Sequence, residues 1–213
     1  MDSTNRRHPS KNLARLLVIL ISLDLLLGCY IVWDNDYDFN NWSQRIIGTG
    51  TNKMALGMLG PGSPSGRGNS LNVDLLQPGD IILGGNNGST YGRFTHAAIY
   101  QEKGYAWDGW LDAGVRQMKV SEFLDYDRAC ILRVKTNKLV KTRAVSYVAA
   151  QKGKLFYPLT FKKGERIWNC TKTIWQAYHR QGIDLDNGED IWVVPDNLYN
   201  SSEVLVIDQS GEI

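Results

Sequence analysis

Cys170 is the residue of this sequence whose type and position best suit covalent chemistry. It follows Asn169 at the point where an amphipathic segment begins. Asn is a favoured helix N-cap, because its side-chain oxygen accepts a backbone N–H of the first turn. A thiol in that turn lies at the positive end of the helix dipole, which favours the thiolate. We therefore expect Cys170 to be a nucleophile on a helix that runs to about Gln181.

A thiol nucleophile needs a neighbouring base, and His96 is the best candidate. It stands at the start of an apolar, strand-like run. His179 is the other histidine of this region, nine residues after Cys170 on the same predicted helix. Nine steps of about 100° bring His179 to the opposite side, roughly 13 Å along the axis. We expect His179 to face solvent and His96 to serve Cys170.

Asp108 is the candidate that orients the imidazole of His96. Residues 94–101 and 105–110 have the composition of two strands, and residues 102–104 suit a three-residue hairpin loop. With that loop, His96 and Asp108 share one face of the sheet as diagonal neighbours, about 7–8 Å apart at their backbones. A loop of two or four residues would place them on opposite faces.

Taken separately, these three residues also fit ordinary roles, as an inert core thiol, a hydrogen-bonded histidine and a turn aspartate. A zinc site made by the three is disfavoured, because zinc takes four ligands, or three plus water, at local spacing. We expect neither a metal nor another cofactor. Cys29, Cys130 and Cys170 are too irregularly spaced for a disulfide framework. A Cys130–Cys170 bridge is the alternative if the domain lies outside the cell.

Composition predicts one globular domain and argues against a nucleic-acid partner. The chain has 213 residues, of which 43% are hydrophobic and 22% charged. Residues 1–33 hold four of the 24 basic and two of the 22 acidic side chains, which leaves 20 of each in the rest. Nucleic-acid binding depends on clustered positive charge, which this formally neutral body does not supply.

The N-terminus has the features of a membrane segment. Basic residues precede an apolar run of 18 residues, 16–33, and acidic residues follow it. This asymmetry predicts a cytoplasmic N-terminus and a domain outside the cytoplasm. The run is near the lower limit for a span, and Asp24 costs roughly 2.5–3.5 kcal/mol at mid-membrane. We favour a retained anchor. The alternatives are a cleaved secretion signal, a lipoprotein signal acylated at Cys29, and a buried soluble helix.

The remaining chain divides into a tether over residues 34–70, rich in Gly and Pro, and a domain over 71–213. Within the domain, periodicity predicts helices over 138–151 and 170–181. Strands are expected over residues 81–83, 94–101, 105–110, 114–118, 129–134, 193–194 and 204–207. Because strands and helices are segregated, we expect an α+β fold with a small antiparallel sheet packed on helices.

Several of these segments resemble one known family, the permuted NlpC/P60 (YiiX/YaeF-like) papain-fold cysteine hydrolases. The resemblance is carried by LQPGDIIL at 76–83, THAAIY at 95–100, NCTKTIWQAY at 169–178, GIDLD at 182–186 and VPDNLYNS at 194–201. It covers about residues 71–207. In the permuted group the histidine strand precedes the cysteine helix, as it does here.

The resemblance implies a papain-like fold and a catalytic set of Cys170, His96 and Asp108, the last at a position that is often Glu in relatives. It implies a cysteine amidase or peptidase that works through a thioester. Its substrates would be cell-wall (peptidoglycan) peptides at the outer face of the membrane. One alternative is a hydrolase or acyltransferase acting on lipids or N-acyl amides, which a membrane tether suits equally. The other is a catalytically inactive binding module of the same fold.

Overall fold

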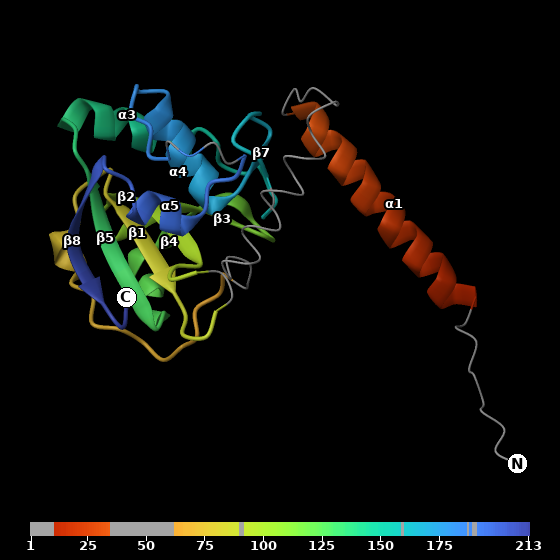
Figure 1. Cartoon of the computed structure of the whole chain (residues 1–213), viewed down its shortest axis with the longest axis horizontal. Helices are drawn as coiled ribbons and strands as arrows, with labels where there is room; N and C mark the ends of the chain where they lie inside the picture. The colour runs from red at the N-terminus through yellow and green to blue at the C-terminus, as the bar shows by residue number, and fades with distance from the viewer. Residues whose placement is uncertain (1–10, 35–61, 90–91, 159, 187, 189–190) are drawn as a thin grey trace, which may run out of the picture.

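The computed structural model describes residues 11–34, 62–89, 92–158, 160–186, 188 and 191–213. It consists of an α+β body and one long helix, α1 (Lys11–Asp34), that extends away from it (Figure 1). Most of the tether predicted over 34–70 lies outside the described residues, as does most of the basic tip that precedes α1. Residues 62–70 run along the body, where Gly66 and Asn69 donate backbone hydrogen bonds to the carbonyls of Asp125 and Leu124.

A six-stranded sheet forms the centre of the body. Its order is β4-β3-β2-β1-β5-β8, and each neighbouring pair is antiparallel. The predicted α+β class with an antiparallel sheet is therefore confirmed. The strands are β1 (Ile81–Gly85), β2 (His96–Glu102), β3 (Tyr105–Trp110), β4 (Gly114–Lys119), β5 (Arg128–Val134) and β8 (Val204–Ser210).

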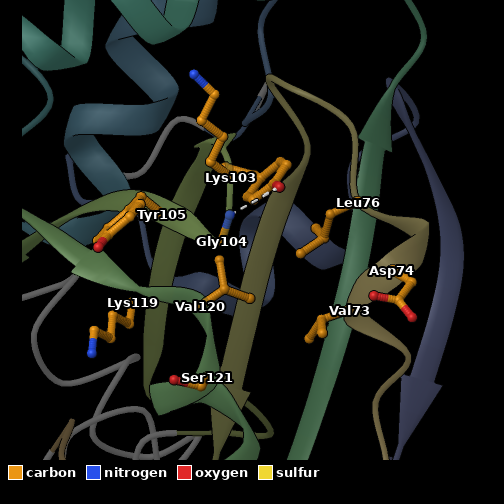
Figure 2. Close-up of a pocket in the computed structure, with 10 residues that line it drawn as sticks. Val73, Asp74, Leu76, Lys103, Gly104, Tyr105, Lys119, Val120 and Ser121 are labelled. Carbon is orange, nitrogen blue, oxygen red and sulfur yellow. Dashed lines mark hydrogen bonds between the residues drawn. The ribbon is translucent and has the colours of Figure 1, made fainter.

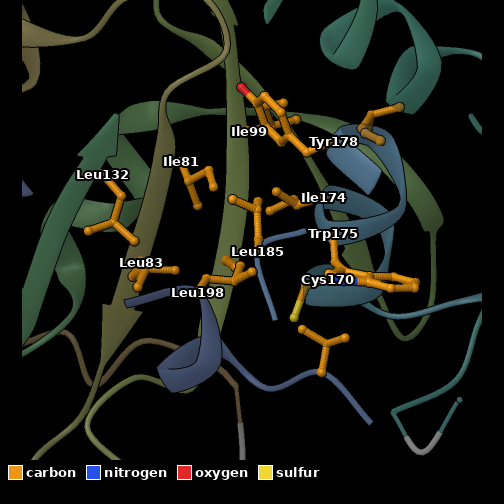
Figure 3. Close-up of a cluster of buried hydrophobic side chains, with 14 of the residues drawn as sticks. Ile81, Leu83, Ile99, Leu132, Cys170, Ile174, Trp175, Tyr178, Leu185 and Leu198 are labelled. Carbon is orange, nitrogen blue, oxygen red and sulfur yellow. The ribbon is translucent and has the colours of Figure 1, made fainter. Parts of the chain in front are cut away.

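The helices α3 (Lys138–Ala149) and α4 (Cys170–His179) lie together on one face of the sheet (Figure 1). Side chains alternate between the faces of a strand, so Ile81 and Leu83 point toward these helices. Figure 3 shows both turned toward Ile174 of α4. Ile82 points to the opposite face, which the 3-10 turns η1 (Val73–Leu75) and η2 (Val120–Asp125) cover.

One prediction about the last third of the chain needs correction, and one small element there was not predicted. Residues 193–194 do not form a strand but lead into a short helix, α5 (Pro195–Tyr199). Pro195 suits the first turn of that helix, where its missing N–H has no intrahelical partner. The structure also has a small parallel pair, β6 (Leu155–Phe156) and β7 (Ile167–Trp168). Strands of two residues are too short to produce an alternating pattern.

The β2–β3 hairpin differs from the predicted one in its turn. Glu102 pairs with Tyr105 around a two-residue turn, not the predicted three-residue loop. Both turn residues have positive φ, 53° at Lys103 and 78° at Gly104. A two-residue turn alone would invert the faces, but a register shift between Tyr100 and Glu102 restores them. The strand residues nearer the predicted site therefore keep the expected parity.

The helix α1 is long and apolar enough to cross a membrane, by length and composition, over Asn12–Ile31 with a mean hydropathy of 2.1. A signal sequence would have the same properties, so the helix is compatible with either role. Cys29 on α1 is an exposed free thiol. Cys130 and Cys170 are also free, so the alternative of a bridge between them is wrong.

Candidate active site

Cys170 is the first residue of α4, and Asn169 caps the helix as predicted. The Asn169 side chain accepts the backbone N–H of Lys172 at 2.7 Å. Its amide group also donates to the carbonyl of Pro158 at 3.1 Å, so the cap is held from both sides. Cys170 is 7% exposed, and its sulfur points away from Ile174 at the edge of the core (Figure 3). The start of the helix thus presents a thiol with limited access to solvent.

His96 opens β2 and is hydrogen-bonded to Asp108 of β3. Its Nε2 atom lies 2.9 Å from Oδ2 of Asp108. The imidazole meets the ring of Trp110 edge-on at 5.0 Å and stacks on Phe123 at 5.7 Å. The Cys170 side chain lies close enough to the ring to raise its pKa. Because Nε2 serves Asp108, Nδ1 is the nitrogen available to the thiol. The structure therefore brings all three predicted residues together.

Asp108 is buried and is held by a second partner that sequence reasoning missed. Arg116 of β4 donates from Nε to Oδ1 at 3.1 Å and from Nη2 to Oδ2 at 3.4 Å. A carboxylate that is 2% exposed needs such pairing, because an unpaired buried charge is costly. The signal for Arg116 was present in the tight β3–β4 hairpin. In this hairpin Trp110 pairs with Gly114, and the same register places Arg116 opposite Asp108.

The surroundings of His96 favour its charged form. Burial disfavours the imidazolium and lowers its pKa, but the hydrogen bonds to Asp108 and Cys170 outweigh this and raise the pKa of His96 to about 9. The ring therefore holds a proton at neutral pH beside the thiol. Cys130 on β5 is a contrasting case, because burial, with a smaller effect from Asp208, raises the pKa of its thiol to about 12. Among the described residues of the body, Cys170 is the thiol that lies beside a histidine.

Cys170 and His96 both line a cavity of about 340 Å³. Its other walls come from distant parts of the chain, namely Gly62, Ser63, Thr95, Gly109, Trp110, Leu111, Phe156, Pro158 and Asn169. A Cβ atom at Gly109 would lie 2.8 Å from the Phe156 ring and 3.3 Å from the Asn169 backbone. The absent side chain at Gly109 therefore lets β3 carry Asp108 close to the start of α4.

A larger hollow of about 480 Å³ lies elsewhere, beside the β2–β3 turn and between η1 and η2 (Figure 2). Its charged side chains are Asp74, Lys103 and Lys119, and it has no Cys or His in its lining. It therefore offers no thiol–imidazole pair, and volume alone does not identify the site. His179 near the end of α4 is exposed, as predicted. Its ring stacks on Trp175, with 4.7 Å between the ring centres.

Comparison with known proteins gives one structural relative. No family model matches the sequence, and no curated protein matches it. The fold is similar to the crystal structure of the metalloprotein YiiX from Escherichia coli O157:H7, of the DUF1105 group. The two share 13% identity and a TM-score of 0.53 over 64% of this chain and 98% of YiiX. The similarity shows a shared fold with a member of the YaeF/YiiX-like family. In the described part of this chain, no three His, Cys, Asp or Glu side chains are grouped to hold a metal ion.

Proposed function

We propose that this chain is a thiol-dependent hydrolase that cleaves amide or ester bonds through an acyl intermediate on Cys170, with the catalytic set of a permuted papain-like enzyme. The observation that carries the proposal is the position of His96. Its imidazole contacts Asp108 through Nε2 and the Cys170 side chain on the wall of a cavity. A nucleophile, a base and an orienting group in hydrogen-bond reach are the parts that nucleophilic acyl transfer needs.

In the first half of the reaction, His96 holds the proton that the Cys170 thiol has given up, and the thiolate attacks the substrate carbonyl carbon. The C–S bond forms and the carbonyl π electrons move to oxygen. When the tetrahedral intermediate collapses, the C–N or C–O bond breaks and the imidazolium gives its proton to the leaving amine or alcohol. The product is a thioester on Cys170.

In the second half, water replaces the leaving group. His96 removes a proton from the water as it attacks the thioester, and the C–S bond breaks. The proton returns to the sulfur, which releases a carboxylic acid and restores the thiol. Asp108 keeps the imidazole in one orientation and stabilises its charged form throughout.

The oxyanion of each tetrahedral intermediate needs hydrogen-bond donors. The backbone N–H of Cys170 belongs to the first turn of α4, where N–H groups have no intrahelical acceptor. Directed at the oxyanion, one such donor contributes roughly 3 kcal/mol to transition-state stabilisation in known cases. The helix dipole adds to the same effect.

The direct test compares turnover by the wild type, Cys170→Ala and His96→Ala on N-acyl amide and peptide substrates. We expect both variants to lose at least 100-fold in activity while keeping the wild-type circular dichroism. Equal turnover by Cys170→Ala would overturn the mechanism. An unreactive Cys170 thiol in a folded protein would instead support the rival function, a binding module of the same fold.

The proposal places the enzyme at a membrane, with α1 as a retained anchor and the body outside the cytoplasm. It leaves two substrate classes, cell-wall peptides and acyl lipids, since both present a carbonyl to the same thiol.

A further inference from the structure

A segment before the first strand of the body borders the cavity at the thiol. We call residues 62–69 the strap, and they fall within the stretch that the sequence assigns to a tether. Gly62 and Ser63 of the strap line the cavity. A Cβ atom at Gly62 would lie 3.3 Å from the carbonyl oxygen of Thr95, the residue that precedes His96. The strap therefore passes directly beside the start of β2.

Asp127 fastens the strap to the body. Its carboxylate, 3% exposed, accepts hydrogen bonds from the Ser65 hydroxyl and, at 3.0 Å, from Nε of Arg67. Its Oδ2 atom lies 2.8 Å from Nη2 of Arg67 and accepts the backbone N–H of Asn87 at 2.6 Å. Burying a carboxylate is favourable only with such partners. Asp127 therefore joins the strap to the loop after β1.

Two asparagines hold the strap on either side of this contact. The Asn86 side chain accepts the backbone N–H of Ser65 at 3.1 Å and donates to the carbonyl of Ser63 at 2.6 Å. At the far end of the strap, the Asn69 side chain donates to the carbonyl of Tyr126 at 2.9 Å. A free linker rich in Gly and Ser behaves as a flexible coil. These contacts instead make the strap a fixed wall of the body.

Tyr126 connects the strap to the base. Its hydroxyl donates to the carbonyl of Gly62, and its ring stacks beside the imidazole of His96, with 6.4 Å between the ring centres. The ring of Tyr126 lies against Gly84 of β1, where a Cβ atom would be only 2.5 Å from it. The absent side chain at Gly84 therefore lets one tyrosine reach both the imidazole and the strap.

The reacting groups are closely covered while the strap is in place. His96 is 3% exposed and Cys170 is 7% exposed, although both line the cavity. A substrate carbonyl has to come within about 3–3.5 Å of the sulfur to react. Close-packed walls resist a larger group, because admitting it forces side chains and backbone to shift. The position of the strap therefore limits what can reach the thiol.

We propose that the strap is a specificity-determining part of the site, and that its attachment to Asp127 and Tyr126 sets how large a group can reach Cys170. This inference rests on the proposed hydrolase function and adds a residue set that acts on access to its thiol. Loss of the attachment should widen the cavity on the side of His96. It should leave the imidazole on Asp108, because that contact is made between β2 and β3.

The test measures access to Cys170 with two reagents that share one reactive group and differ in size, iodoacetamide and 5-iodoacetamidofluorescein. The full chain in mild detergent is labelled with each, and peptide mass mapping gives the two rates at Cys170. We expect Asp127→Ala to raise the ratio of the bulky to the small reagent about fivefold or more. Tyr126→Phe removes a single hydroxyl and should raise the same ratio by a smaller factor. An unchanged ratio in both variants would overturn the proposal.

Asp125→Ala is the matched control. Asp125 is exposed and holds the strap through its backbone carbonyl, which accepts the N–H of Gly66, so this variant should keep the wild-type ratio. The buried thiol of Cys130 reports general unfolding in every variant. If Asp127→Ala labels Cys130 as well, Tyr126→Phe decides, and a wild-type ratio in that variant would overturn the proposal.

Turnover separates this proposal from the hydrolase function on which it rests. With p-nitrophenyl esters, the preference for acetate over the bulky 4-phenylbenzoate should fall about fivefold or more in Asp127→Ala. A wild-type preference in that variant, with Cys170 still acylated, would contradict the role of the strap alone. No acylation of Cys170 by either ester in the wild type would overturn the hydrolase function itself.

Discussion

The imidazole of His96 is joined to the carboxylate of Asp108 across two neighbouring strands, with 2.9 Å between Nε2 and Oδ2. The pair depends on strand register, because a shift of one residue would turn one side chain to the other face. It fixes the ring orientation and leaves Nδ1 for Cys170. The properties of this pair lead to the first prediction.

Asp108→Asn should lower kcat roughly 100-fold, as expected for impaired general acid–base catalysis. It should also shift the pH profile. The pKa of His96 is raised to about 9, so the proton that the leaving group needs is present below that pH and is lost above it. Without the carboxylate charge, the pKa falls and the alkaline limb moves down by about 1 pH unit. The measurement is kcat against pH from 6 to 10.

The control for this variant is Asp112→Asn, an exposed aspartate in the β3–β4 turn. It should keep both the rate and the alkaline limb of the wild type. If Asp108→Asn also kept the wild-type limb, the assignment of that limb to the His96–Asp108 pair would be wrong.

Arg116→Gln should destabilise the protein, because it removes the ion-pair partner of a buried carboxylate. Breaking a fully buried pair costs 3–5 kcal/mol, and the Arg116 side chain is 31% exposed, so we expect about 2 kcal/mol. Urea unfolding measures the loss. Arg116→Lys keeps the charge without the two-pronged contact and should lose less. Equal stability of Arg116→Gln and wild type would show that Asp108 does not depend on this arginine.

The two thiols of the body should differ sharply in reactivity. Cys170 lies beside a base on a cavity wall, whereas Cys130 is fully buried and burial raises the pKa of its thiol to about 12. Iodoacetamide at pH 7 should therefore alkylate Cys170 in the native protein and spare Cys130. Peptide mass mapping distinguishes the sites. His96→Ala should slow the reaction about tenfold or more, and an equal rate would contradict activation of the Cys170 thiol by His96.

Substitutions at Asn169 test both the stability that the α4 cap provides and the reactivity of Cys170. Asn169→Ala loses the cap on Lys172 N–H, which should cost about 1 kcal/mol of unfolding free energy. Asn169→Asp keeps a capping oxygen but replaces the amide donor to the Pro158 carbonyl with a second carboxylate oxygen, so it should also lose stability. Its negative charge beside Cys170 disfavours the thiolate, so alkylation at pH 7 should slow several-fold. Faster alkylation of Asn169→Asp than of wild type would contradict a thiolate mechanism.

The sequence was sufficient to predict that Cys170, His96 and Asp108 come together as a candidate site, although each residue alone also fits an ordinary role. Asn169 and Cys170 mark the helix start, and alternation along β2 and β3 assigns faces to His96 and Asp108. The predicted route to that parity was nevertheless wrong. A positive φ at Lys103 has no sequence signal comparable to that of a glycine, and the compensating register shift depends on how the whole hairpin twists.

Contacts between distant segments could not be predicted in the same way. Asp34 was placed at the start of a tether, because nothing near it in the sequence indicates the N–H groups of Glu165 and Arg166. The buried ammonium of Lys172 is a similar case. Its acceptors are backbone carbonyls, which every residue has, so composition gives no sign of them. Burial lowers the pKa of Lys172 to about 8, against opposing effects of Asp34 and Glu165.

The most direct test of the central claim is to trap the acyl enzyme. The full chain is mixed with excess p-nitrophenyl acetate, quenched in acid within seconds and mapped by peptide mass spectrometry. We predict an acetyl group on Cys170 that hydroxylamine removes, with none on Cys130 and a much slower appearance in His96→Ala. Acetylation confined to other residues, or equally fast acetylation of Cys170 without His96, would contradict the account.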